Sequence, residues 1–164
     1  MRFTLTILIA IFVALFASLT SAHLCLYDPA QRGAAVPTPL GPGDNNCYKV
    51  ASNCGNMTSG ASVATYYSGT AIPVTFQQNY NHWYPTNMGY MDVAISYTGD
   101  NGPYTTLNQL DDFNAWDMVA QTNFTVSSQL PSTKGAAVLR VRYVSNNAGE
   151  PYTTFYQCSD ITVI

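Results

Sequence analysis

Apolar side chains at every second position constrain the fold of this chain more than any other feature. Over residues 136–144 the apolar positions are Ala137, Leu139, Val141 and Tyr143. Over residues 90–97 they are Met91, Val93, Ile95 and Tyr97. Successive side chains of a β-strand point to opposite faces of the sheet, so both segments are predicted to be strands with one buried face.

Further segments complete an all-β pattern. We expect strands over residues 71–77, 123–127 and 153–164, and another around residues 116–121. Residues 98–114 are predicted to be rich in turns. Residues 28–69, rich in Pro, Gly, Asn and Ser, are predicted to form a long irregular segment. Short strands separated by turns, with no sustained helical period, predict a single antiparallel β-sandwich of the immunoglobulin or fibronectin type.

The first 22 residues have the pattern of a secretory signal peptide. A short positive start precedes an almost unbroken apolar run over residues 5–16, which is too short to span a bilayer. Thr20 and Ala22 then stand at the −3 and −1 positions of a signal-peptidase site. An uncleaved N-terminal anchor is the alternative. Cleavage would leave a secreted, extracellular domain, residues 23–164, that begins at His23.

Four cysteines remain in the domain: Cys25, Cys47, Cys54 and Cys158. An even number in an oxidising compartment predicts two disulfides, in any of three pairings, that hold the irregular segment. A zinc site is the alternative, but the spacings lack paired Cys-x-x-Cys knuckles. Sequons at Asn56 and Asn123 predict N-glycosylation.

The charge of the domain excludes two classes of partner. All nine acidic residues of the chain lie in it, against five of the six basic residues. Nucleic acids and anionic membranes require a basic patch to displace counterions, so neither is expected as a partner. No later apolar stretch is long enough to cross a membrane. We expect a monomer.

The chain contains only two histidines, His23 and His82. An N-terminal histidine offers both its α-amine and its ring Nδ1 to a metal, and a second imidazole completes a planar set of three nitrogens. Such a set suits Cu(II). Because the amine is free only after cleavage at Ala22, we predict that the mature protein binds one copper ion. The alternative is that His23 merely marks the cleavage point and His82 is an ordinary loop residue.

Motifs around these histidines support the copper prediction. The mature chain begins His23-Leu24-Cys25, and Asn81-His82-Trp83 lies in a central loop. Residues 155–161 read F-Y-Q-C-S-D-I, close to F-Y-Q-x-x-D-V, and Glu150 stands five residues before them. In these features, and in the strand over residues 137–143, the sequence resembles the lytic polysaccharide monooxygenase superfamily. It is most similar to the chitin-binding-type-4 group and its small eukaryotic relatives, as a distant small member.

The resemblance implies roles for individual residues. His23 and His82 would be the copper ligands and Phe155 an apolar axial residue. Glu150 would steer a small oxidant or a proton near copper, and Gln157 would join the catalytic set. Fungal cellulose-active members instead place a Gln two residues before an axial Tyr. The small residue that often precedes the second histidine in the family is replaced by Asn81 in this sequence.

The family usually ties its C-terminal strand to the early loop, which favours Cys54–Cys158 and leaves Cys25–Cys47. The pairing of Cys47 with Cys54 and of Cys25 with Cys158 stays open.

The predicted activity is oxidative cleavage of a polysaccharide such as chitin or cellulose, by an enzyme that needs copper and an external reductant. Tyr80, Trp83 and Tyr84 would stack on sugar rings. The alternatives are a copper-binding or copper-acquisition protein without oxygenase activity, and a secreted carbohydrate-binding module. A conventional hydrolase is not expected, because neither a carboxylate pair nor a nucleophile elbow is evident.

Overall fold

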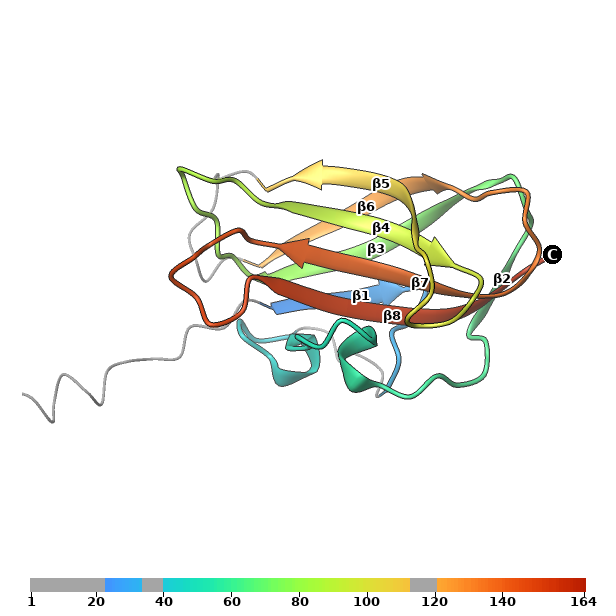
Figure 1. The fold of residues 1–164 in the computed structure, drawn as a ribbon, viewed down its shortest axis with the longest axis horizontal. Helices are drawn as coiled ribbons and strands as arrows, with labels where there is room; N and C mark the ends of the chain where they lie inside the picture. Colours follow the sequence, from blue (N-terminus) through green and yellow to red (C-terminus); the bar gives the residue numbers. More distant parts are fainter. Residues whose placement is uncertain (1–22, 34–39, 113–120) are drawn as a thin grey trace, which may run out of the picture.

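The computed structural model describes residues 23–33, 40–112 and 121–164, and two facing β-sheets make up nearly all of its regular structure (Figure 1). The smaller sheet has the order β1-β3-β6, with β1 at His23–Asp28, β3 at Ala71–Tyr80 and β6 at Thr122–Gln129. The larger has the order β2-β8-β7-β4-β5, with β2 at Ala64–Tyr66, β4 at Tyr90–Ser96, β5 at Thr105–Asp111, β7 at Gly135–Val144 and β8 at Thr154–Val163. The predicted β-sandwich is confirmed.

The predicted alternation places the core between the sheets. β4 and β7 pair in antiparallel register through Met91–Tyr143, Val93–Val141 and Ile95–Leu139. All six side chains are buried and pack against apolar residues of β1 and β3 from the other sheet. Burial of side chains of this size contributes on the order of 1.5–3 kcal/mol each, so this face dominates the stability of the sandwich.

One strand pair departs from the antiparallel pattern. β2 runs parallel to β8, with Ala64 opposite Ile161 and Tyr66 opposite Val163. The remaining described pairs are all antiparallel. β2 and β8 are far apart in the chain, so no hairpin dictates their relative direction.

Three strands appear where none was predicted, and one of them, β2, lies inside the segment predicted to be irregular. β1 begins at His23, and β5 lies inside the stretch predicted to be rich in turns. The apolar residues of β5, Leu107 and Leu110, are three positions apart, which a regular strand would place on opposite faces. A register shift opposite Val93 and Ala94 allows both to pack against the core. Of the strand expected around residues 116–121, only Gln121 is among the described residues, and the signal peptide lies outside them.

The described part of the segment between β1 and β2, residues 29–33 and 40–63, is mostly irregular, as predicted, and disulfides hold it. It contains two short 3₁₀ helices, η1 (Asn45–Cys47) and η2 (Cys54–Asn56). Cys25 is bonded to Cys47 and Cys54 to Cys158, the pairing that the family resemblance favours. Buried Arg32 adds a further tie, because its guanidinium bonds the carboxylates of both Asp100 and Asp160.

Strands of both sheets begin or end at one end of the sandwich, at the left of Figure 1. The pairings of His23 with Tyr80, Tyr90 with Val144, and Val144 with Thr154 place the start of β1, the end of β3 and the loop between β7 and β8 together. This end carries both histidines. None of the helices in the described part of the chain could cross a membrane.

Candidate metal site

The strand register brings the two histidines to the same aromatic ring. His23 is the first residue of β1 and lies opposite Tyr80, and His82 follows Tyr80 by two residues. The centroid of the Tyr80 ring is 6.4 Å from that of His23 and 5.2 Å from that of His82. Both imidazoles are buried, 4% and 1% exposed. The two predicted ligands therefore share one site, although 58 residues of chain separate them in the sequence.

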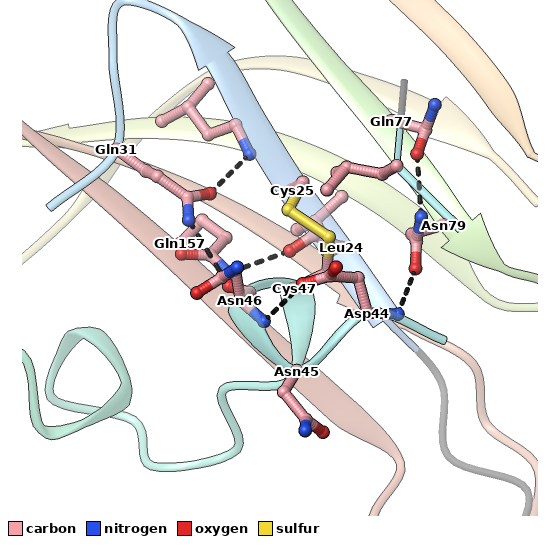
Figure 2. The surroundings of a disulfide bond; sticks show 12 residues. Leu24, Cys25, Gln31, Asp44, Asn45, Asn46, Cys47, Gln77, Asn79 and Gln157 are labelled. Carbon is pink, nitrogen blue, oxygen red and sulfur yellow. Dashed lines mark hydrogen bonds between the residues drawn. A yellow bond between two sulfur atoms is a disulfide. The ribbon is translucent and has the colours of Figure 1, made fainter. Parts of the chain in front are cut away.

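Gln157 and a disulfide fix the start of β1 at Leu24 and Cys25, the two residues after His23 (Figure 2). The Gln157 side chain extends from β8 and donates from Nε2 to the carbonyl oxygens of Leu24, at 2.8 Å, and of Asn46, at 3.0 Å. The Cys25–Cys47 bond joins the same two segments. Gln157 thus bonds the backbone next to His23, and its place in the catalytic set stays a prediction.

A loop over residues 41–47 covers the other side of His23. Buried Asn79 accepts a hydrogen bond from Asp44 N and donates one to Gly41 O (Figure 2 shows the first). Gly43 has a φ of 74°, and a Cβ there would lie 3.8 Å from His23 Cε1. The left-handed conformation favours glycine at this position. Asn79 was not predicted from the sequence, because nothing marks a buried amide within a strand.

His82 is held at two points. Its backbone N–H donates to the hydroxyl of Tyr143 at 2.9 Å, and its ring Nδ1 lies 3.1 Å from Glu150 Oε1. Glu150 comes from the loop between β7 and β8, where its own N–H bonds Asn147 O. A carboxylate that accepts from one ring nitrogen fixes the tautomer and leaves the other nitrogen to face a metal.

Phe155 lies where an apolar wall of the site would be. Its side chain is buried in β8, and its ring centroid is 6.3 Å from that of His82. The rings of Tyr48 and Tyr143 pack against it, each with centroids 6.1 Å away. The phenyl ring has no donor atom, so this side of the site offers no side-chain ligand.

The donor set fits copper if the amine of His23 is free. Imidazole nitrogens suit copper and zinc. No group of three His, Cys, Asp or Glu side chains in the described residues could hold a metal ion, so a third donor of another kind is required. The α-amine that cleavage after Ala22 would create belongs to one of the two histidines. Two imidazoles and this amine are the nitrogen donors that Cu(II) prefers in a planar set.

The surface around the histidines differs in part from the predicted sugar platform. Tyr84 is exposed, but Tyr80 is half-buried against the imidazoles, and Trp83 is half-buried with its indole nitrogen buried. Tyr152, which was not predicted, is 48% exposed and packs edge-on against Tyr48, with ring centroids 6.2 Å apart. Tyr48 in turn contacts the His23 ring at 5.2 Å. Among the described residues, Tyr84 and Tyr152 are therefore the exposed aromatic residues of this end.

A buried carboxyl beneath the site was also missed. Asp112 follows β5 and accepts hydrogen bonds from the Tyr143 hydroxyl, at 2.7 Å, and from Gln78 Nε2, at 3.1 Å. Burial raises the pKa of Asp112, against the effect of these two bonds, and burial also raises the pKa of Tyr143. A sequence signal existed in the pair Asp111-Asp112 at the end of a strand, but nothing identified which of the two is buried.

The predicted glycosylation sites both lie on the surface. Asn56 ends η2 and Asn123 lies in β6, and both residues are exposed. Asn123 Oδ1 accepts a hydrogen bond from Gln77. Modification of either residue stays a prediction.

A family model described as lytic polysaccharide mono-oxygenase, cellulose-degrading, matches residues 31–161. The match includes His82, Glu150 and Phe155 and begins after His23. A search of curated proteins finds no match.

A search of solved structures gives matches of low identity. A lytic polysaccharide monooxygenase important for chitin utilisation in Cellvibrio japonicus is 13% identical, with 85% of this chain and 99% of that chain covered and a TM-score of 0.49. The AA15 monooxygenase from Thermobia domestica in the Cu(I) state is 15% identical, with 78% and 71% covered and a TM-score of 0.41. A monooxygenase from Kitasatospora papulosa is 12% identical, with 61% and 51% covered and a TM-score of 0.37. The match thus spans about half of the last protein.

Proposed function

Because the chain belongs to the lytic polysaccharide mono-oxygenase family, we propose that residues 23–164 form a secreted mononuclear copper protein that cleaves a polysaccharide such as chitin or cellulose by oxidation. One observation carries the proposal: the only two histidines of the chain are buried against the same ring, that of Tyr80. Residues 1–22 are the signal peptide, and its removal frees the amine that completes the ligand set.

The two histidines bind through different atoms. His23 presents its α-amine and its ring. His82 Nδ1 lies 3.1 Å from Glu150 Oε1. With its proton on Nδ1, toward this carboxylate, the ring would leave the lone pair of Nε2 available to the metal. Glu150 therefore acts on the ligand His82 itself. The family resemblance gives the same carboxylate a second role, which is to steer an oxidant or a proton near copper.

When bound, copper would accept an electron from an external reductant and activate an oxygen co-substrate. Phe155 keeps one side of the site free of a competing donor. Glu150 and Phe155 both lie within a few residues of the exposed loop that presents Tyr152. Oxidation would thus occur next to a surface that a polysaccharide can reach.

The substrate surface is carried by Tyr84 and Tyr152. Both are exposed, and their loops meet at the site because Asn146 Nδ2 donates to Met88 O at 3.0 Å. Flat aromatic faces pack on the apolar faces of sugar rings. The acidic balance of the domain and its few charges favour a neutral polysaccharide over an anionic one.

A copper-binding protein without oxygenase activity is the second candidate. It is favoured by the half-burial of Tyr80 and Trp83, which leaves Tyr84 as the exposed member of the three predicted sugar contacts. A secreted carbohydrate-binding module that holds no metal would instead make the burial of both histidines incidental.

Activity assays with a matched variant separate these functions. Protein that begins at His23 is loaded with one copper ion and incubated with a reductant on chitin and on cellulose, and soluble oxidised oligosaccharides are measured by mass spectrometry. We expect oxidised products from at least one substrate, and their loss in His82→Ala. Tight copper binding without oxidised products from either substrate would favour the copper-binding protein. Polysaccharide binding without copper binding would favour the binding module.

A further inference from the structure

A cluster of fully buried polar side chains lies beneath the loop that carries His82. Its members are Gln78 of β3, Asn81 of the loop, Asp112 after β5 and Tyr143 of β7, each at most 1% exposed. A carboxyl and two amides at this depth are costly to bury, and a sandwich core does not need them. Polar side chains buried in an apolar core at such a cost often belong to a functional site.

The direction of the hydrogen bonds follows from the single proton of the Tyr143 hydroxyl. Its oxygen is 2.7 Å from Asp112 Oδ2 and 3.4 Å from Asn81 Oδ1, so the proton is donated to Asp112. A lone pair of the same oxygen then faces His82, whose backbone N–H donates to it at 2.9 Å. Asp112 therefore orients the hydroxyl that holds His82.

The rest of the cluster fixes the neighbouring residues of the loop. Asn81 Oδ1 accepts from the backbone N–H of Trp83 at 2.8 Å. Gln78 Nε2 donates to Asp112 Oδ1 at 3.1 Å and approaches Asn81 Oδ1 at 3.4 Å. Two consecutive backbone N–H groups, of His82 and Trp83, are thus bound by side chains of this cluster. Glu150 constrains the same loop through its contact with the buried ring nitrogen Nδ1 of His82.

We infer that Tyr143, oriented by Asp112, is a positioning residue for the second metal ligand, because its hydroxyl holds the backbone from which the His82 imidazole reaches the site. This inference rests on the proposed function. Phenyl packing against Phe155 does not need the hydroxyl, so the role belongs to the oxygen of Tyr143 and not to its ring.

Tyr143→Phe removes the oxygen and keeps the ring. In metal-free protein that begins at His23, the His82 amide should exchange with solvent at least tenfold faster than in the wild type, as followed by hydrogen exchange in NMR spectra. Copper affinity should fall about tenfold or more, in the range that loss of an outer-shell partner causes. The Cu(II) electron paramagnetic resonance spectrum should change, since the direction of the His82 ring is no longer fixed.

Two further variants separate positioning from stability. Ser159→Ala removes another fully buried hydroxyl of the larger sheet, bonded to Ala30 O at 2.7 Å, four residues along β8 from Phe155 or about 13 Å. It should leave the copper affinity and the spectrum unchanged. Asp112→Asn keeps an acceptor for Tyr143, and the unbonded Oε1 of Gln78 can accept from the new amide after that side chain turns over. This conservative variant should bind copper nearly as the wild type does.

The outcomes are distinct. If the wild type binds no copper tightly, the proposed function fails and the inference with it. If the wild type binds copper and Tyr143→Phe matches it in affinity, spectrum and His82 exchange, the inference is overturned while the proposed function stands. If Tyr143→Phe does not fold, Asp112→Ala replaces it, and wild-type affinity in that variant would equally overturn the inference.

Discussion

We expect one disulfide to matter more for stability and the other to matter more for metal binding. Cys25–Cys47 closes a loop of 22 residues next to His23, whereas Cys54–Cys158 closes one of 104 residues. The change to test is the replacement of each pair by alanine. Cys25→Ala with Cys47→Ala frees the start of β1, and Cys54→Ala with Cys158→Ala frees η2 from β8.

The loop lengths set the expected loss of stability. Chain entropy gives about 3.4 kcal/mol for the 22-residue loop and about 4.7 kcal/mol for the 104-residue loop. Removal of Cys54–Cys158 should therefore lower the free energy of unfolding more. Its sulfur atoms lie in a separate buried cluster with Val138, next to Tyr104, so the arrangement of the histidines should persist.

Copper affinity should show the reverse order: removal of Cys25–Cys47 should weaken copper binding more than removal of Cys54–Cys158. The Cys25–Cys47 bond is two residues from His23, and without it the side-chain hydrogen bonds of Gln157 and Gln31 tie this part of β1 to η1. If the binding arrangement is then populated in about a tenth of the molecules, the apparent Kd rises about tenfold. Urea unfolding measures the stability of both variants, and copper titration under conditions where both are folded measures the affinity. Equal losses of copper affinity in the two variants would refute the local role of Cys25–Cys47.

Other predictions concern single side chains. Glu150→Gln should weaken copper binding about 10- to 100-fold, because an amide is a poorer acceptor for the His82 ring; an unchanged titration would show that the contact is incidental. Tyr84→Ala and Tyr152→Ala should each weaken binding to insoluble polysaccharide by about 0.5–1.5 kcal/mol in depletion assays without changing copper affinity, and unchanged adsorption would exclude these residues as the platform. Burial raises the pKa of Asp112 above its ordinary 3.8, so the folded protein binds more protons than the unfolded chain between the two pKa values. The free energy of unfolding should therefore fall, relative to Asp112→Asn, as the pH rises through that window, and parallel pH profiles from urea unfolding would contradict this.

The fold was predictable where side chains alternate regularly. Met91, Val93 and Ile95 follow period two and lie in the core as expected. β5 was not predictable, because a register shift restores to one face the two leucines whose spacing breaks the alternation. β1 carries no regular alternation either, since four consecutive residues from His23 are buried.

The sequence predicted the two histidines of the candidate site but not the side chains that support them. His23 and His82 are the only histidines in the sequence, and the F-Y-Q motif identifies Phe155. The roles of Gln157, Asp112 and Tyr143 depend on hydrogen bonds that span more than 30 positions of the chain. Such contacts leave no local pattern, and only the packing of the two sheets brings these side chains beneath the histidines.

Copper titration of two proteins that differ by one residue tests the central claim most directly. One protein begins at His23 and the other retains Ala22, which turns the amine of His23 into a peptide nitrogen. We predict that the first binds one Cu(II) tightly, with a nitrogen-rich axial electron paramagnetic resonance spectrum, and that the second loses this affinity and spectrum. Weak and equal binding by both proteins would contradict the copper site and leave a β-sandwich whose two buried histidines serve packing alone.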